Sequence, residues 1–147
     1  MIYEQINADI KTAMKAADRP RVEALRFALS VLNSFQKDKQ AKETGAVITD
    51  EETVAVLQKE AKRRRDSIEL FRQGGREDLV AKEEADLVIL RGYLPKELTR
   101  ADLEAMVDAA IAGGANDFGS IMREVMKAAK GRTDGKAVGE VIKGKLG

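Results

Sequence analysis

Apolar residues recur every three or four positions along almost the whole chain, and this spacing is the feature that most constrains its fold. The spacing matches the 3.6-residue period of an α-helix, and no segment shows the strict alternation of a half-buried β-strand. Only 2 of the 147 residues are proline, so few positions forbid a helix from continuing. The sequence therefore predicts an all-α protein.

Two helices are expected in the first third of the chain. The first spans about 2–17. Asp18 and Pro20 have the pattern of an N-cap followed by a first-turn proline, so a second helix is expected to begin there. Its apolar pattern fades near Gly45.

Two further helices are expected to form a hairpin. Thr49 and Glu52 have the spacing of a capping box, which opens the third helix of the chain. Gly74 and Gly75 end it, because glycine accepts the left-handed conformation at a helix C-terminus. A fourth helix then runs over about 76–92.

Pro95 marks the expected domain boundary. Proline has no backbone N–H and pushes the residue before it out of helical space. Beyond it, Thr99 and Asp117 are N-cap signals, and the apolar spacing indicates three short helices. We expect two subdomains: a bundle of about four helices over residues 1–95 and a small three-helix subdomain over residues 96–147.

The chain contains no His and no Cys, which removes several kinds of chemistry. Triads of the Ser-His-Asp type, Cys-His pairs, disulfides and ordinary zinc sites all require one of these residues. Carboxylates, Lys, Ser, Thr and Tyr remain available for catalysis, and we predict no catalytic residues, no metal and no cofactor. No apolar run approaches the roughly 20 residues of a membrane helix, so we expect no membrane association. The first residues, Met1 to Glu4, lack the layout of a secretory signal, which favours a cytoplasmic location.

The formal net charge of +1 hides a segregation of charge along the chain. Residues 62–76 carry six basic and two acidic side chains, and residues 119–147 carry seven basic and three acidic ones. Residues 77–118, between these stretches, carry four basic and ten acidic ones. The two basic stretches predict basic patches that could neutralise the phosphates of a nucleic-acid backbone.

The candidate RNA contacts are cations of these two basic stretches. Few aromatic side chains are available to stack on bases, so we expect binding to depend on backbone contacts and strongly on salt. The alternative for the run 62–65 is an ordinary solvated helix face, on which Asp66 and Glu69 make local pairs. The candidates are Arg123, Lys127, Lys130, Arg132, Lys136, Lys143 and Lys145, supplemented by Arg63, Arg65, Arg72 and Arg76.

Arg64 differs from its neighbours because it falls on the apolar stripe of its helix. A guanidinium that points inward needs a carboxylate partner, since an unpaired buried charge is very costly. In the expected hairpin, position 64 lies opposite position 85, so Glu83 and Asp86 are the nearest carboxylates. We expect a semi-buried ion pair that fixes the register of the hairpin. An acid/base site and a weak Mg²⁺ site at the same carboxylates are the alternatives.

The segment from Gly131 to Lys136 superficially resembles a nucleotide-binding P-loop. Its glycines are separated by three residues where that motif has four, and no strand precedes it. Asp134 and Gly135 instead fit a tight turn between short helices. Arg132, Lys136 and the N-terminus of the last helix could together hold one phosphate, and a plain turn is the alternative.

Several motifs occur in a fixed order along the chain. They are Lys62-x-Arg64-x-x-Ser67-Ile68-x-x-Phe71, Gly75-Arg76-x-Asp78-Leu79, Glu83-x-x-Asp86-Leu87, Tyr93-Leu94-Pro95, Asp117-Phe118-Gly119-x-x-Met122 and Gly131-Arg132-x-Asp134-Gly135-Lys136. Together they resemble the GatB/YqeY family, over essentially the whole chain and most closely from about 60 to 146. Two departures are Asp86, where the family pattern has Glu, and Phe118, where Met is common.

This resemblance implies a two-part helical protein whose C-terminal part is similar to the tail domain of the B subunit of tRNA-dependent amidotransferase. That enzyme converts Glu-tRNA or Asp-tRNA to the amide form with glutamine as nitrogen donor, and its tail is implied to contact tRNA. The family label thus implies a carbon–nitrogen ligase with glutamine as amido donor, although kinship of a domain does not carry an active site with it. We expect a tRNA-binding accessory module that is not catalytic by itself. The alternative is a factor that binds amidotransferase subunits or other protein partners through its helix faces.

Overall fold

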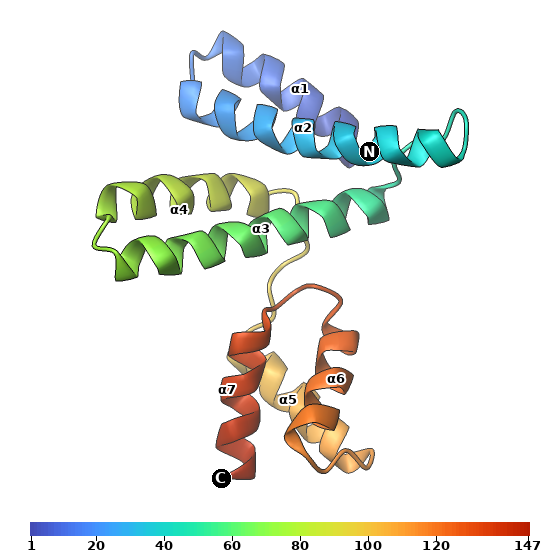
Figure 1. Cartoon of the computed structure of the whole chain (residues 1–147), viewed down its shortest axis with the longest axis vertical. Coiled ribbons are helices and arrows are strands. Elements are labelled where there is room, and N and C mark those ends of the chain that lie inside the picture. Colours follow the sequence, from blue (N-terminus) through green and yellow to red (C-terminus); the bar gives the residue numbers. More distant parts are fainter. The chain divides into compact units, whose positions relative to one another are not determined.

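The computed structural model describes all residues from Met1 to Gly147 and contains seven α-helices, which confirms the all-α prediction. The chain divides into two compact units, unit 1 (Met1–Leu94) and unit 2 (Pro95–Gly147) (Figure 1). No α-helix combines the length and the apolar composition that a membrane span requires. The helices are α1 (Ile2–Lys15), α2 (Arg19–Lys42), α3 (Asp50–Gln73), α4 (Glu77–Arg91), α5 (Arg100–Ala112), α6 (Phe118–Ala129) and α7 (Gly135–Leu146).

Local capping signals set where the helices begin. At the start of α3, the Thr49 hydroxyl accepts the N–H of Glu52 at 3.1 Å, and the Glu52 carboxylate accepts the N–H of Thr49 at 3.0 Å. Thr99 and Asp102 form the same reciprocal box at the start of α5. Each box satisfies two backbone N–H groups that a helix N-terminus otherwise leaves without a partner.

Left-handed residues other than glycine follow the ends of two helices. Ala17, with φ of 55°, lies just beyond α1, so this helix ends at Lys15 rather than near residue 17 as expected. Lys130, with φ of 48°, is the C-cap of α6, and Gly131 after it is also left-handed. In this conformation the Cβ of any other residue crowds the backbone, and glycine avoids this because it has no Cβ. Ala17 and Lys130 therefore both carry local strain.

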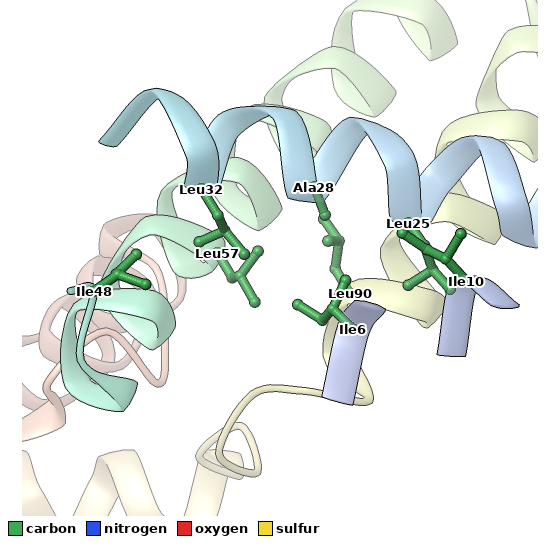
Figure 2. Packing of buried hydrophobic residues seen from close by; sticks show 8 residues of the cluster. All are labelled: Ile6, Ile10, Leu25, Ala28, Leu32, Ile48, Leu57 and Leu90. Carbon is green, nitrogen blue, oxygen red and sulfur yellow. The ribbon is translucent and has the colours of Figure 1, made fainter. Parts of the chain in front are cut away.

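Unit 1 packs two helical pairs, α1 with α2 and α3 with α4, around a cluster of aliphatic side chains (Figure 2). Leu25 and Leu32 of α2 and Leu57 of α3 are completely buried in this cluster. A second, smaller cluster, which includes Ile68 and Val80, packs α3 against α4. These two clusters hold the α3–α4 hairpin and dock it against α2.

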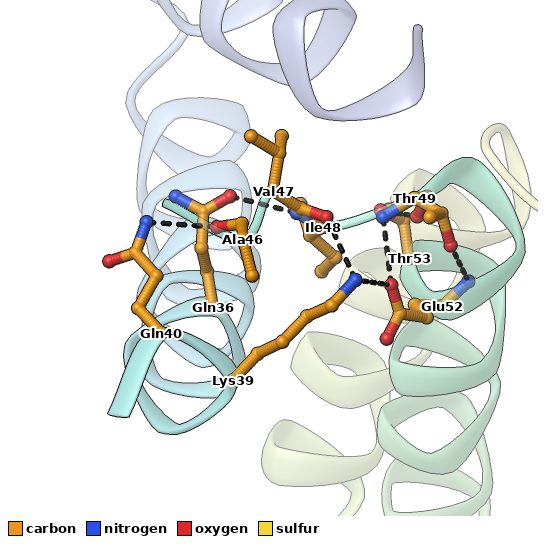
Figure 3. A network of polar contacts seen from close by, with 9 residues as sticks. All are labelled: Gln36, Lys39, Gln40, Ala46, Val47, Ile48, Thr49, Glu52 and Thr53. Carbon is orange, nitrogen blue, oxygen red and sulfur yellow. Dashed lines mark hydrogen bonds and ion pairs between the residues drawn. The ribbon is translucent and has the colours of Figure 1, made fainter. Parts of the chain in front are cut away.

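The connection between α2 and α3 is held by polar side chains of α2 (Figure 3). Lys39 donates to the carbonyl of Val47 at 2.9 Å and forms an ion pair with Glu52 at 2.6 Å. Gln36 and Gln40, one helical turn apart, bind backbone groups of the same connection. The connection is therefore fastened along one side of α2.

Unit 2 packs α5, α6 and α7 around a cluster whose buried members are all aliphatic. Val107, Ile121 and Ile142, one from each helix, are completely buried. Gly139 of α7 lies beside the ring of Phe118, and a Cβ at this glycine would be 3.5 Å from the Cζ atom of that ring. The three-helix core thus closes without any buried charge.

Candidate functional site

Arg64 of α3 contacts two carboxylates of α4. Its Nη1 atom donates to Glu83 at 2.9 Å and to Asp86 at 3.0 Å. These side chains are largely covered, with 13% of Arg64, 20% of Glu83 and 14% of Asp86 exposed. The ring of Phe27 on α2 lies 5.1 Å from the guanidinium carbon of Arg64, which is a cation–π contact. One guanidinium therefore ties α2, α3 and α4 together.

Arg64, Glu83 and Asp86 form a group that we call the Arg64 cluster. Its charge is unbalanced, because two carboxylates share one cation. Burial raises the pKa of Asp86 against the attraction of Arg64, and the negative charges of Glu83 and Glu23 add to this effect. The Nε–H of Arg64 is buried without an acceptor. No group of three or more carboxylates is placed to hold a metal ion. The arrangement is suited to fixing the register of the α3–α4 hairpin.

The other basic residues of the 62–76 stretch mostly contact carboxylates within unit 1. These contacts cancel much of the positive charge that the stretch would present to a phosphate backbone. Most of the partners are exposed, so the pairs add little stability. The pairs are Lys62–Asp66 at 3.3 Å, Arg63–Glu60 at 3.0 Å, Arg72–Glu84 at 3.0 Å and Arg76–Asp78 at 3.0 Å.

Arg132, a candidate RNA contact, binds the segment that precedes α5. Its Nε donates to the carbonyl of Lys96 at 2.8 Å, and its own carbonyl accepts the N–H of Leu98 at 2.9 Å. Asp134 caps α7 with its side chain, and Lys136 in the first turn of this helix is exposed. The Gly131–Lys136 segment is thus an interhelical turn in which Arg132 makes structural contacts.

The cations of α6 and α7 point away from the core of unit 2. Arg123 and Lys127 lie four residues apart on α6, and Lys143 lies on α7; all three are exposed. None of these three forms an ion pair, whereas Lys145 pairs with Asp108 of α5 at 3.2 Å. Among all candidates, the exposed ones are Arg63, Arg72, Arg76, Arg123, Lys127, Lys130, Lys136, Lys143 and Lys145, and the half-buried ones are Arg65 and Arg132.

Sequence reasoning missed two aromatic contacts in unit 1. The hydroxyl of Tyr93 donates to the carboxylate of Asp9 on α1. Burial, and then this hydrogen bond, raise the pKa of Tyr93. The Tyr-Leu-Pro motif singled out Tyr93 without indicating its partner. Phe27 had no signal at all, because it lies off the buried stripe of α2 and is 47% exposed.

The family of YqeY-like proteins matches residues 3–146, which include nearly all of both units. The chain belongs to this family. Several residues that carried the resemblance have structural roles in this YqeY-like chain. Arg64 and Asp86 form the ion pair between α3 and α4, Tyr93 bonds to α1, and Arg132 holds the segment before α5.

Relatives of this YqeY-like chain include two proteins named "Altered inheritance of mitochondria protein 41, mitochondrial". The one from Pyrenophora tritici-repentis is 31% identical over 138 residues, which covers 90% of this chain and 73% of that protein. The one from Lachancea thermotolerans is 33% identical over 107 residues, which covers 73% of this chain and 54% of that protein. An uncharacterized protein of Schizosaccharomyces pombe is 32% identical over 91 residues, which covers 62% of this chain and 70% of that protein.

Proposed function

We propose that this YqeY-like chain is a tRNA-binding accessory protein, related to glutamine-dependent tRNA amidotransferase and not catalytic by itself. One observation carries the proposal: α6 and α7 present Arg123, Lys127 and Lys143 to solvent without ion pairs. These residues belong to the stretch 119–147, which has seven basic and three acidic side chains. Cations in this state lose no carboxylate partner when they bind phosphate, so they suit the backbone of an RNA.

Unit 1 has a lesser part in this proposal. Four cations of its basic stretch contact carboxylates of the same unit, so phosphate binding would have to compete with those pairs. Arg123, Lys127 and Lys143 face no such competition. We therefore assign the main RNA contact to unit 2 and regard Arg63, Arg65, Arg72 and Arg76 as secondary candidates.

The non-catalytic part of the proposal rests on the residue types present. Release of ammonia from glutamine needs a nucleophile, and the sequence has neither Cys nor a recognisable Ser-Ser-Lys arrangement. The carbon–nitrogen ligase chemistry that the family label implies would then reside in a partner enzyme. Ammonia release from glutamine by the purified chain would contradict this part.

Titration of tRNA with the full chain at two salt concentrations tests the RNA-binding part. We expect affinity to fall steeply with salt, because bound cations replace counterions on the phosphates. The double substitution Lys127→Gln and Lys143→Gln should reduce the salt slope by about 1 per lysine. A matched control is Lys11→Gln with Lys37→Gln, which removes the same charge from exposed positions of unit 1 that are not candidates.

Undetectable or salt-independent binding would count against tRNA as the partner, as would equal losses in the two double variants. A pull-down that retains the same protein partners after RNase treatment would favour the protein-interaction alternative instead. Release of ammonia from glutamine is assayed with and without amidotransferase subunits. Release that requires the subunits indicates that the chain assists that enzyme, and release without them indicates activity of the chain itself.

Cytoplasmic residence is also part of the proposal. Two of the relatives carry "mitochondrial" in their names, which is a statement about those proteins. Fractionation of cells that express the tagged full-length protein measures its location directly, and enrichment with mitochondria would replace the cytoplasmic assignment.

A further inference from the structure

A cavity of about 850 Å³ opens between α2, α3 and α4 of unit 1, beside the Arg64 cluster. Small-molecule sites in proteins usually measure about 300–1,000 Å³, so the cavity is of suitable size. Pro20, Ala24 and Phe27 contribute to an apolar wall. The Arg64 guanidinium lies against the Phe27 ring, yet Phe27 is 47% exposed, so part of the ring at the wall of the cavity remains accessible.

The ionisable groups that line the cavity differ in sign according to their exposure. Carboxylates outnumber cations three to one among the covered groups, and cations outnumber carboxylates three to one among the exposed groups. The covered groups are Glu60, Arg64, Glu83 and Asp86, and the exposed groups are Arg19, Glu23, Arg63 and Lys82.

Internal pairing leaves this charge gradient in place. The pair between Arg63 and Glu60 cancels one charge at the rim and one inside. Inside, Arg64 then faces two carboxylates, which leaves one excess negative charge. At the rim, Arg19 and Lys82 face the single carboxylate of Glu23, which leaves one excess positive charge. The cavity is therefore acidic within and basic at its mouth.

We propose that this cavity binds a small zwitterion whose ammonium group is separated from its anionic group by an aliphatic chain. The ammonium lies beside Phe27 and the carboxylates of α4, because an aromatic face and anionic oxygens both attract organic cations. The anionic group lies at the rim near Arg19 and Lys82. The aliphatic chain covers the apolar wall between them. This ligand site lies in unit 1 and goes beyond the tRNA contact proposed for unit 2.

Three matched compounds test the proposal by ¹⁵N-resolved NMR titration of the full chain. They are 6-aminohexanoate, which has both charges, hexylamine, which lacks the anion, and hexanoate, which lacks the ammonium. We expect 6-aminohexanoate to give saturable shifts of amides around Phe27, Ser67 and Ala85. Its affinity should exceed that of either singly charged compound by about threefold or more, since each exposed ionic contact contributes modestly.

Two variants locate the contacts. Phe27→Leu keeps an apolar side chain while removing the ring, and should weaken both amines by about threefold. Lys82→Gln should weaken 6-aminohexanoate and leave hexylamine unchanged. Phe118→Leu and Lys37→Gln are matched controls outside the cavity, and neither should alter the titration. The proposal is overturned by absence of saturable shifts, by equal affinity for all three compounds, or by undiminished 6-aminohexanoate affinity in either cavity variant.

Discussion

Both units consist of α-helices, but they place charged side chains differently. Unit 1 covers an arginine between two carboxylates and buries Thr53 and Glu60. Unit 2 buries only aliphatic side chains and Gly139, and uses its charges at helix caps and on its surface. A covered charge must meet its partner, so it specifies which helices pair. An aliphatic core makes no such demand, and Arg123, Lys127 and Lys143 of unit 2 are exposed without ion pairs.

Arg64→Glu should produce the largest loss of stability, because it places a third carboxylate between Glu83 and Asp86. Breaking a buried ion pair costs about 3–5 kcal/mol, and charge reversal should reach at least this range. Urea unfolding followed by circular dichroism measures the loss.

Arg64→Lys is the control for this charge reversal. A single nitrogen of Arg64 serves both carboxylates, so a lysine ammonium can replace part of the contact. If the free energy of unfolding of the Arg64→Glu variant lies within about 1 kcal/mol of that of the unmodified chain, the Arg64 cluster does not hold unit 1 together.

Ile121→Ala should destabilise unit 2 by about 3 kcal/mol, because the substitution leaves a cavity in a completely buried, aliphatic part of the core. Amide hydrogen exchange should accelerate in α5, α6 and α7. The buried clusters of the two units share no residue, so exchange in α3 and α4 should stay unchanged. Equal acceleration in α3 and α4 would contradict the separation of the cores.

A fall in pH should change the contributions to folding stability of the cap carboxylates of unit 2 and of Asp86 of unit 1 in opposite directions. Hydrogen bonds with Thr99 lower the pKa of Asp102, and those with Ser120 lower the pKa of Asp117. Their stabilising effect is present above the ordinary aspartate pKa of 3.8 and is lost as the pH falls through the lowered pKa values. The raised pKa of Asp86 gives a contribution that is present below pH 3.8 and lost as the pH rises through that pKa.

Carboxyl-carbon NMR titration tests this contrast group by group. Asp102 and Asp117 should titrate below 3.8 and Asp86 above it. If all three titrated together, the difference in environment between exposed caps and the covered ion pair would be disproved.

Lys130→Gly should give the smallest effect, and it should be stabilising. The left-handed C-cap of α6 strains a lysine, and glycine relieves this strain by a few tenths to about 1 kcal/mol. Thermal unfolding measures the gain. Ala17→Gly is the equivalent change in unit 1 and should give a gain of similar size; a loss of stability in both variants would contradict the strain.

Features that depend on neighbouring residues in the sequence were predictable. The capping box at Thr49 and the N-cap at Thr99 are local, so both appear in the structure. The contact of Arg64 with Glu83 and Asp86 follows from the equal distances of the two helix segments from the Gly74-Gly75 turn. The motifs also pointed to the family that the comparison shows.

Contacts that depend on tertiary packing were not predictable. Arg132 looked like a phosphate ligand in the sequence, and only the fold brings the carbonyl of Lys96 to its side chain. The pairing of Arg72 with Glu84 likewise depends on the exact approach of α3 and α4. A basic stretch in a sequence therefore overstates the charge that a helical pair leaves for a nucleic acid.

The fastening of the α2–α3 connection has a consequence for proteolysis. Exposed loop tips are preferred cleavage sites, and a protease must draw an extended piece of backbone into its cleft. Here Gln36, Lys39 and Gln40 bind the backbone of the connection (Figure 3). Cleavage would first require this backbone to detach from α2. The rate of cleavage would therefore measure how often the connection detaches. We therefore expect these three long polar side chains to slow cleavage of the α2–α3 connection.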